Sequence, residues 1–185
     1  MKTIEFEIPK GFTVKETNSE KVILHMIEEP VKEIILSGNL SKEFYRNGDP
    51  IPYAYTNDEW EWYGKNRIGC RCAYNNSIDN LNKHGYLYNW YAVNDPRGLA
   101  SEGWHVPSDE ELKVLSGILK KNILFSGYRS NNGNFGSLTY NAYFWSSTEH
   151  SSTPAWSLYL SYNSEDVYRF NYVKTNGFSV RCIKD

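Results

Sequence analysis

Residue types that serve in nucleophilic catalysis stand close together in the stretch WHVPSDEE, which contains His105, Ser108 and Asp109. They could act as base, nucleophile and orienting acid, but only in a geometry that adjacency in the sequence does not supply. The same residues fit a helix start, because Ser108 and Glu111 have the spacing of a capping box and Asp109 would favour the helix dipole. We therefore expect His105 to pack beside Trp104, and we expect no catalytic residue.

Metal-binding residue types are few and scattered. The four histidines show no metal-ligand spacing, and the three cysteines stand at positions 70, 72 and 182. A structural zinc site needs four ligands, so one disulfide or buried thiols explain the cysteines more simply. The segment RSNNGNFGS lacks the Lys-Ser or Lys-Thr end of a phosphate-binding loop and is expected to be a turn. We expect no metal and no cofactor.

Composition excludes some partners and favours others. The chain has 185 residues and a formal net charge of −2, so a basic surface for nucleic acid is not expected. Its start, MKTIEFEIPKGF, lacks the apolar core of a signal peptide, and no apolar run approaches membrane-spanning length. The 15 Tyr, 8 Phe and 6 Trp are an excess of aromatic residues. Tyrosine suits binding surfaces, because its rigid ring and hydroxyl make contacts at low entropic cost.

The first 40 residues are predicted to form a small addition. The alternating stretch 3–8 and the apolar stretch 21–28 flank turn-rich residues, which predicts a β-hairpin. A short helix is expected over 30–38, between a proline and a glycine. We interpret residues 1–40 as an attachment region and residues 41–185 as the main domain.

Helices and strands of the main domain predict an α+β class. NDEWEWY favours an amphipathic helix that buries Trp60 or Trp62. After the capping box, leucines at helical spacing predict a helix over about 109–120. Short strands separated by Gly, Asn and Ser turns are expected at YFWSS, AWSLYLSY, DVYRFNYV and GFSVRCI.

Alternation in two of these strands predicts a surface. Side chains of a strand point alternately to its two faces. If Leu158, Leu160 and Val167 face the core, one outward surface carries Tyr159, Ser161, Asp166, Tyr168, Phe170 and Tyr172. A second buried face is the alternative, but the interleaved polar residues favour exposure, because such residues are rarely buried without partners.

Several motifs resemble one family. GYLYNWYAVNDPRGLASEGWHVPSDEEL, SGYRSNNGNFGSL, FWSSTE and the ending GFSVRCIKD are similar to the Fibrobacter succinogenes major paralogous domain, as are RNGDPIP and CAYNN upstream. The resemblance covers about residues 44–185. It implies a C-type-lectin-like fold of the formylglycine-generating-enzyme branch, with the capped helix packed on a small twisted sheet. The framework tryptophans would be Trp90, Trp104, Trp145 and Trp156.

The resemblance also bears on the metal-binding motifs and the cysteines of this chain. The copper-binding cysteine pair of the enzymes has no counterpart in the C-terminal half, and the sugar and calcium motif of true C-type lectins is absent. The implied fold could bring Cys72 and Cys182 together as a disulfide.

The C-terminal region further resembles the variable region of proteins that diversity-generating retroelements mutate at adenines. Asparagine-type codons then yield Asn, Tyr, Ser, Asp, His, Thr, Phe or Val. On this resemblance the ligand-binding residues would be Tyr140, Asn141, Tyr143, His150, Ser157, Tyr159, Ser161, Asp166, Tyr168, Phe170, Tyr172 and Val173.

The sequence therefore predicts a ligand-binding protein, not an enzyme, that displays a diversified Tyr/Ser/Asn surface to a protein or glycan on a cell. Its expected place is the surface of a phage virion, or of a bacterial cell if the chain is truncated at its N-terminus, and an oligomer is compatible with the sequence. The alternatives are a formylglycine-generating-type oxidase or another glycan-active enzyme, and a purely structural subunit.

Overall fold

The computed structural model describes residues 12–18, 21–26, 38–121 and 123–185. The chain divides into two compact units, Met1–Ile34 and Ile35–Asp185. No helix among the described residues is long and apolar enough to cross a membrane.

The smaller unit contains an antiparallel hairpin of β1 (Phe12–Asn18) and β2 (Lys21–Met26). The expected second strand is confirmed, but the first strand occupies residues that we predicted as a turn. Thr13, Val14 and Thr17 are β-branched and favour strands, and this preference prevails over the neighbouring turn residues. The strand expected at 3–8 and residues 30–37 of the expected helix lie outside the described residues.

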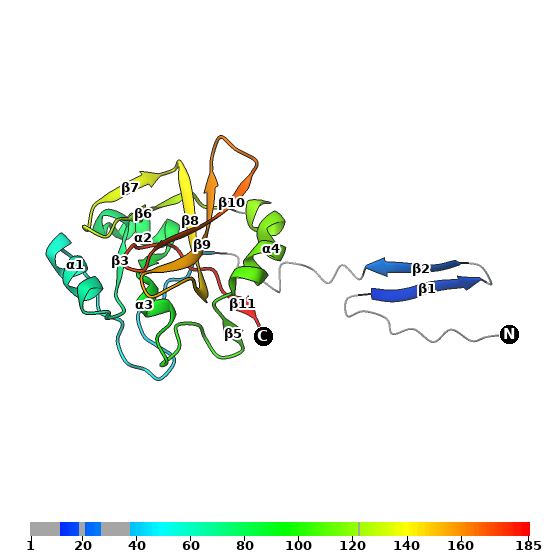
Figure 1. Ribbon diagram of the computed structural model, residues 1–185, viewed down its shortest axis with the longest axis horizontal. Helices are drawn as coiled ribbons and strands as arrows, with labels where there is room; N and C mark the ends of the chain where they lie inside the picture. The colour runs from blue at the N-terminus through cyan, green and yellow to red at the C-terminus, as the bar shows by residue number, and fades with distance from the viewer. Residues whose placement is uncertain (1–11, 19–20, 27–37, 122) are drawn as a thin grey trace. The chain divides into compact units, whose positions relative to one another are not determined.

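The larger unit is a mixed α+β structure, which confirms the class predicted from the sequence (Figure 1). Its elements, in chain order, are α1 (Asn57–Lys65), β3 (Arg71–Ala73), the 3-10 helix η2 (Tyr74–Asn76), α2 (Ile78–His84), β4 (Tyr86–Tyr88), α3 (Trp90–Val93), β5 (Trp104–His105), α4 (Asp109–Lys121), β6 (Ser126–Arg129), β7 (Phe135–Leu138), β8 (Asn141–Glu149), β9 (Pro154–Ser161), β10 (Val167–Val173) and β11 (Ile183–Lys184).

Both predicted helices of this unit are present. Helix α1 begins at a capping box between Thr56 and Glu59 and buries Trp60, whereas Trp62 is exposed. Helix α4 spans the range predicted from its capping box to within one residue. The turn expected at RSNNGNFGS connects β6 to β7, and there Gly133 adopts a φ of +86°, a conformation that other residues rarely take.

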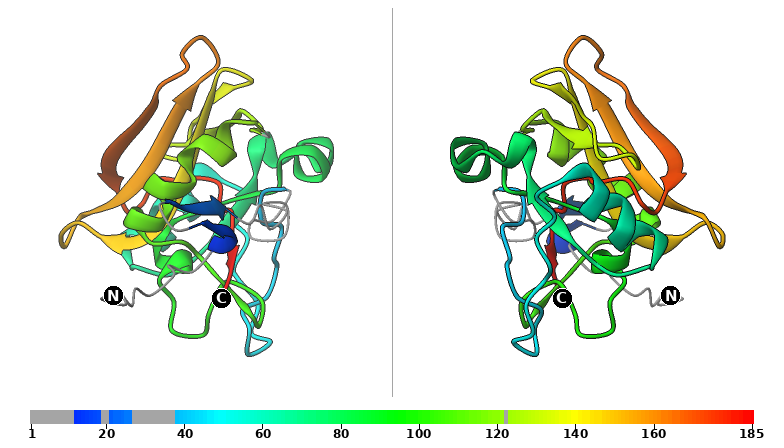
Figure 2. Two further views of the ribbon diagram at one scale, coloured as in Figure 1. Left: turned by 90° about the vertical axis from the view of Figure 1, so that its right-hand side faces the viewer. Right: turned by 90° about the vertical axis from the view of Figure 1, so that its left-hand side faces the viewer.

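A curled five-stranded sheet in the order β10-β9-β8-β6-β7 forms the centre of the larger unit. Strands β6 and β8 pair in parallel, and the other neighbours pair antiparallel. The β9–β10 hairpin lies at one edge of this sheet, and its turn projects beyond the neighbouring strands in all three views (Figures 1 and 2).

The two faces of the sheet pack against different groups. On one face, Leu158 and Leu160 are buried in a cluster with Leu112 and Leu119 of α4, and Val167 packs against it. The other face enters the main core around Trp145, which is fully buried. The inward positions predicted for the leucines and Val167 are therefore confirmed.

The segment GFSVRC is not the regular strand that we predicted. Phe178 bridges to Tyr88, and Ser179 bonds to both Tyr143 and Trp145 through the backbone. Gly177 exchanges two backbone hydrogen bonds with Arg129. Because its partners belong to different strands, the segment crosses the core as a connector, and regular pairing is limited to β11 with β5.

Candidate ligand-binding face

Strands β8, β9 and β10 place five rings on one face of the sheet, which we call the aromatic face: Tyr143, Tyr159, Tyr168, Phe170 and Tyr172. The register aligns Tyr143 with Tyr159 and Tyr159 with Tyr168, so three rings form a row across three strands. Their centroids are 5.1 and 5.8 Å apart. Phe170 follows two residues after Tyr168 on β10, with its centroid 6.1 Å away and its plane tilted by 12°.

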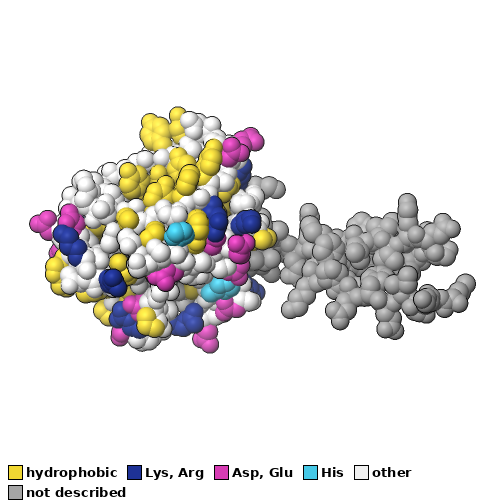
Figure 3. Space-filling model, in the orientation of Figure 1, with side chains coloured by type: hydrophobic (Ala, Val, Ile, Leu, Met, Phe, Trp, Pro, Cys, Tyr) yellow, Lys and Arg dark blue, Asp and Glu magenta, His cyan; other side chains and the backbone are white. Residues whose placement is uncertain are grey.

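Burial changes steadily along this face. Tyr143 is buried and stacks on Phe178 of the core at 4.9 Å. Tyr159 and Tyr172 are half-buried, whereas Tyr168 is 37% exposed and Phe170 is 46% exposed. Figure 3 shows hydrophobic side chains gathered over the β8–β10 region on this view of the molecule. The face is therefore anchored in the core at one end and open to solvent at the other.

Neutral polar groups and one carboxylate surround the rings. The Tyr159 hydroxyl donates to Asn141 Oδ1 at 3.3 Å, and the Tyr168 hydroxyl donates to Asp166 Oδ2 at 3.3 Å. Burial raises the pKa of Tyr143 and of Tyr172, and neighbouring tyrosines raise it further. These two phenols therefore stay protonated at neutral pH, and they offer hydroxyl groups, not charge.

A second aromatic pair lies where β8 begins and β9 ends. Tyr140 and Tyr162 are 56% and 59% exposed, and their rings meet edge to face at 5.2 Å. The Tyr162 backbone N–H donates to the Tyr140 carbonyl at 2.8 Å, which fixes the two residues together. Our sequence reasoning named Tyr140 but missed Tyr162, although its place in the same tyrosine-rich stretch was a usable signal.

Tyr128 was also missed, and no local signal could have found it. It comes from β6, and its ring meets Tyr143 at 5.2 Å. Strand β6 neighbours β8 through a parallel pairing, and a contact of this kind depends on sheet topology, not on local sequence.

Most of the predicted ligand-binding residues come together on or beside the aromatic face. Besides the five rings, these are Tyr140, Asn141, Ser161 and Asp166. Ser161, half-buried at the end of β9, is aligned with Asn141 and donates to Asn163 Oδ1 at 2.7 Å.

Three predicted residues do not belong to this surface. Ser157 is aligned with Phe170 across the β9–β10 pairing but is fully buried, and its hydroxyl donates to the Phe170 carbonyl at 3.2 Å. Val173 is 37% exposed, but alternation along β10 turns it to the opposite face. His150 packs edge to face on Trp156, at 4.7 Å, in the connection between β8 and β9.

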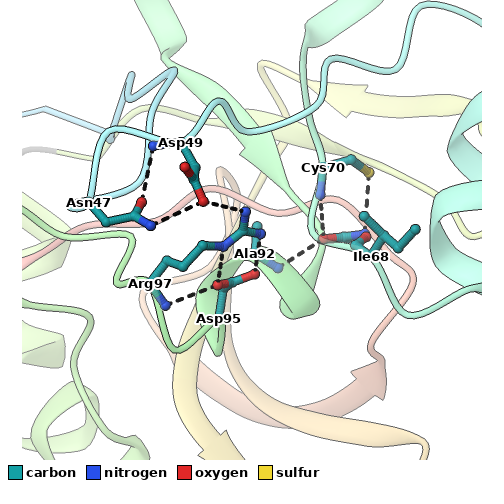
Figure 4. Close-up of polar contacts among 8 residues, drawn as sticks. Asn47, Asp49, Ile68, Cys70, Ala92, Asp95 and Arg97 are labelled. Atoms are coloured by element: carbon teal, nitrogen blue, oxygen red, sulfur yellow. Dashed lines mark hydrogen bonds and ion pairs between the residues drawn. The ribbon is translucent and has the colours of Figure 1, made fainter.

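A concave region lies among the loops before α1 and after α3. It has a volume of about 530 Å³ and is lined by Arg46, Asn47, Pro96 and Arg97. Its two arginines already have partners. Arg97 binds Asp95 through two nitrogens at 2.8 Å and reaches Asp49 at 3.2 Å, as Figure 4 shows, and Arg46 donates to the carbonyls of Ala100, Ser101 and Trp104. Asp49 also accepts from Asn47 at 3.0 Å. This network fixes the two loops to each other and leaves few groups directed at a ligand.

The residues that suggested a catalytic triad are arranged differently. His105 lies between two carboxylates, with Nδ1 2.6 Å from Asp185 Oδ1 and Nε2 3.1 Å from Glu111 Oε1. Ser108 bonds Glu111, at 2.7 Å from hydroxyl to Oε2, and not the histidine. The Ser108 backbone N–H also donates to Glu111, and the Glu111 N–H to Ser108 Oγ, which confirms the capping box.

The three cysteines are free and buried. Cys72 and Cys182 lie in different hydrophobic clusters, so the disulfide that the resemblance suggested is not formed. Burial raises the pKa of both thiols to about 12, and Cys70 accepts a hydrogen bond from Asn89. Among the described residues, no group of three or more His, Cys, Asp or Glu side chains could hold a metal ion.

Comparison with known families finds one match. Residues 36–123 match the family described as the Fibrobacter succinogenes major domain. The matched region begins upstream of Phe44 and ends before the strands of the aromatic face. No curated protein matches the chain.

Proposed function

Through that match the chain belongs to the Fibrobacter succinogenes major domain family, and we propose that it is a binding protein, not an enzyme, whose aromatic face grips a protein or glycan on a cell surface. The observation that carries the proposal is the unbroken contact of five rings from the buried core to solvent, ending in Tyr168 and Phe170.

Such a face suits recognition for two reasons. Exposed aromatic rings gathered in one place are a common mark of an interaction surface. Each ring here also contacts other rings, so little side-chain freedom is left to lose when a ligand binds. Hydroxyl and amide groups beside the rings would supply hydrogen bonds that fix the orientation of the ligand.

A C-type-lectin-like fold is part of the proposal. Helix α4 packed on one face of a twisted sheet supports it, as do Trp90 and Trp145, both buried. The indole of Trp90 donates to the Ser146 carbonyl and that of Trp145 to the Tyr88 carbonyl, each at 2.9 Å. The two tryptophans thus join α3, β4 and β8 into one frame beneath the aromatic face.

The second part of the proposal is that a retroelement diversifies the residues of this face. Tyr168, Phe170 and Asp166 are exposed at the face, and all three are residue types that mutated asparagine-type codons yield. Trp145 and Phe178 lie beneath the face, and neither belongs to the variable set that we predicted. Sequencing the DNA around the gene for an imperfect second copy of the segment encoding about residues 139–182 would test this part separately. A surface on a virion or a bacterial cell, attached through the first 40 residues, is the setting that we propose.

The binding proposal is tested by removing the exposed rings. We expect the double variant Tyr168→Ser and Phe170→Ser to lose at least about tenfold in affinity, because central aromatic contacts commonly carry most of the binding energy. Binding of the purified full chain to a glycan array and to a panel of intact bacterial cells would be measured, with circular dichroism to confirm folding.

The matched control is Val173→Ser. Val173 has the same exposed fraction as Tyr168, 37%, and lies on the same strand, but on the opposite face of the sheet. Binding that survives the double ring substitution, or that the control abolishes equally, would contradict the proposal.

A further inference from the structure

We infer that the partner of the aromatic face is a protein that presents a lysine or arginine side chain to Tyr168 and Asp166. This inference rests on the proposed binding function and narrows its ligand from protein or glycan to a basic protein surface.

The distribution of charge gives the first argument. From Ser130 to Ser164 the only charged residue is Glu149, and Glu165 and Asp166 follow directly in the turn between β9 and β10. Both of these acids are exposed. The open end of the aromatic face is therefore bordered by two negative charges at neutral pH.

The cations of the same region are directed elsewhere. Arg169 stands between Tyr168 and Phe170 on β10, so its side chain points to the other face of the sheet. There it lies over the Trp156 ring at 3.6 Å and donates to Asp109, at the start of α4, at 2.7 Å. Lys174 is buried against Glu149 and the carbonyls of Ser151 and Ser152. Among the described residues of β8, β9, β10 and their connecting turns, no basic side chain thus neutralises the two acids.

The geometry at Tyr168 gives the second argument. Its hydroxyl donates to Asp166 and lies 3.4 Å from Ser164 Oγ, which holds the carboxylate beside the edge of the ring. A guanidinium or ammonium group above the Tyr168 and Phe170 rings would gain a cation–π contact and, at the same place, an ion pair with Asp166. The apolar stem of the same side chain would lie along the exposed rings.

This charge pattern discriminates among ligand classes. A neutral glycan could stack on the rings and donate hydroxyl hydrogen bonds to the two acids, but it carries no positive charge to pair with them. An acidic glycan would be repelled by them, since like charges brought together at an interface oppose binding. A basic side chain uses both the rings and the carboxylates.

The test is selection of a displayed random peptide library on the full chain. We expect the selected peptides to be enriched in Lys or Arg. The double variant Glu165→Gln and Asp166→Asn should bind them about threefold to tenfold more weakly at low salt, a difference that shrinks at high salt.

The control variant Asp58→Asn and Glu102→Gln removes two exposed charges far from the face in sequence and should bind like the wild type. Replacing the basic residue of a selected peptide with norleucine or citrulline should cause the same loss.

The outcomes separate the two proposals. Two results would overturn this inference and leave the binding function standing. In the first, the selected peptides depend on Tyr168 and Phe170 but lack basic residues. In the second, the peptides bind equally well after the two acids are replaced. Selection of no basic peptide, together with binding of glycans that depends on the rings, would do the same. Binding that is indifferent to both the rings and the acids would overturn both proposals.

Discussion

Phe170 shows how a single residue can be both exposed and ordered. Its ring is 46% exposed, yet it lies within 6.1 to 6.2 Å of the ring centroids of Tyr159, Tyr168 and Tyr172. Aromatic pairs in such arrangements are worth about 0.5–1.5 kcal/mol each beyond the area they bury. An exposed phenylalanine with three ring neighbours is thus held in one arrangement although it faces solvent.

His105 was expected to pack beside Trp104, and in the structure its ring lies between the carboxylates of Asp185 and Glu111. Burial, the strongest single influence, lowers its pKa, but hydrogen bonds to Asp185 and Glu111 outweigh burial, and the pKa is raised above 6.5. A histidine that holds its proton more firmly when folded stabilises the protein in its charged form. The contribution is complete below the unfolded pKa and is lost as the pH rises through the folded pKa.

We expect His105→Gln to lower the melting temperature by about 1–2 °C at pH near 5.5 and by less at pH near 9, since half-exposed ion pairs are weak. Thermal unfolding of the variant and the wild type at both pH values would measure the difference. An equal loss at the two pH values would mean that the charge of His105 contributes nothing to stability.

At the scale of elements, helix α4 connects the polar cluster around His105 to the sheet. Its capping box satisfies backbone N–H groups of the first turn, and Asp109 in that turn is 3% exposed and pairs with Arg169 of β10. The leucines of α4 cover the sheet face opposite the rings. The helix therefore supports strands β9 and β10 from behind while their other face stays free.

We expect Ser108→Ala to lower the free energy of unfolding by about 1 kcal/mol, the usual cost of losing a serine cap. The control is Ser116→Ala, because the Ser116 hydroxyl donates to the Lys113 carbonyl of its own helix, at 2.8 Å, and alanine is the better helix former. Urea unfolding would measure both variants. A loss in Ser116→Ala as large as that in Ser108→Ala would show that the cap itself is not important.

At the scale of the whole larger unit, the aromatic face and the core form one continuous structure. Tyr143 is shared by both, because it contacts Phe178 below it and Tyr159 and Tyr172 beside it. The connector at Gly177 to Cys182 holds β4, β6 and β8 together under this face. A surface carried on so many backbone hydrogen bonds can change its outermost residues without losing the frame beneath them.

This arrangement predicts that two rings of one face differ in their effect on stability. We expect Tyr143→Ala to cost about 3 kcal/mol or more, as buried large-to-small aromatic substitutions do. We expect Phe170→Ala to cost about 1.5 kcal/mol, the lower end of what its three ring contacts are worth, because its ring is half exposed. Urea unfolding of the two variants would give both values. Similar costs at the two positions would contradict a division into buried frame and replaceable surface.

Local patterns in the sequence predicted much of this protein, because they depend on neighbours in the chain. The capping box at Ser108 and Glu111 located helix α4, and alternation in LYLSY and DVYRFNY correctly assigned the leucines to the core and the tyrosines to one face. The excess of aromatic residues predicted a binding surface, and that function stays a prediction.

Only the tertiary structure decided which of those residues act together. The burial of Ser157, the contact of Tyr128 with Tyr143, and the separation of Cys72 from Cys182 all depend on strand order and packing. The same is true of GFSVRC, whose backbone partners come from separate strands. Periodicity shows which side of a strand a residue occupies, but what lies over that side is determined by chain segments far away in the sequence.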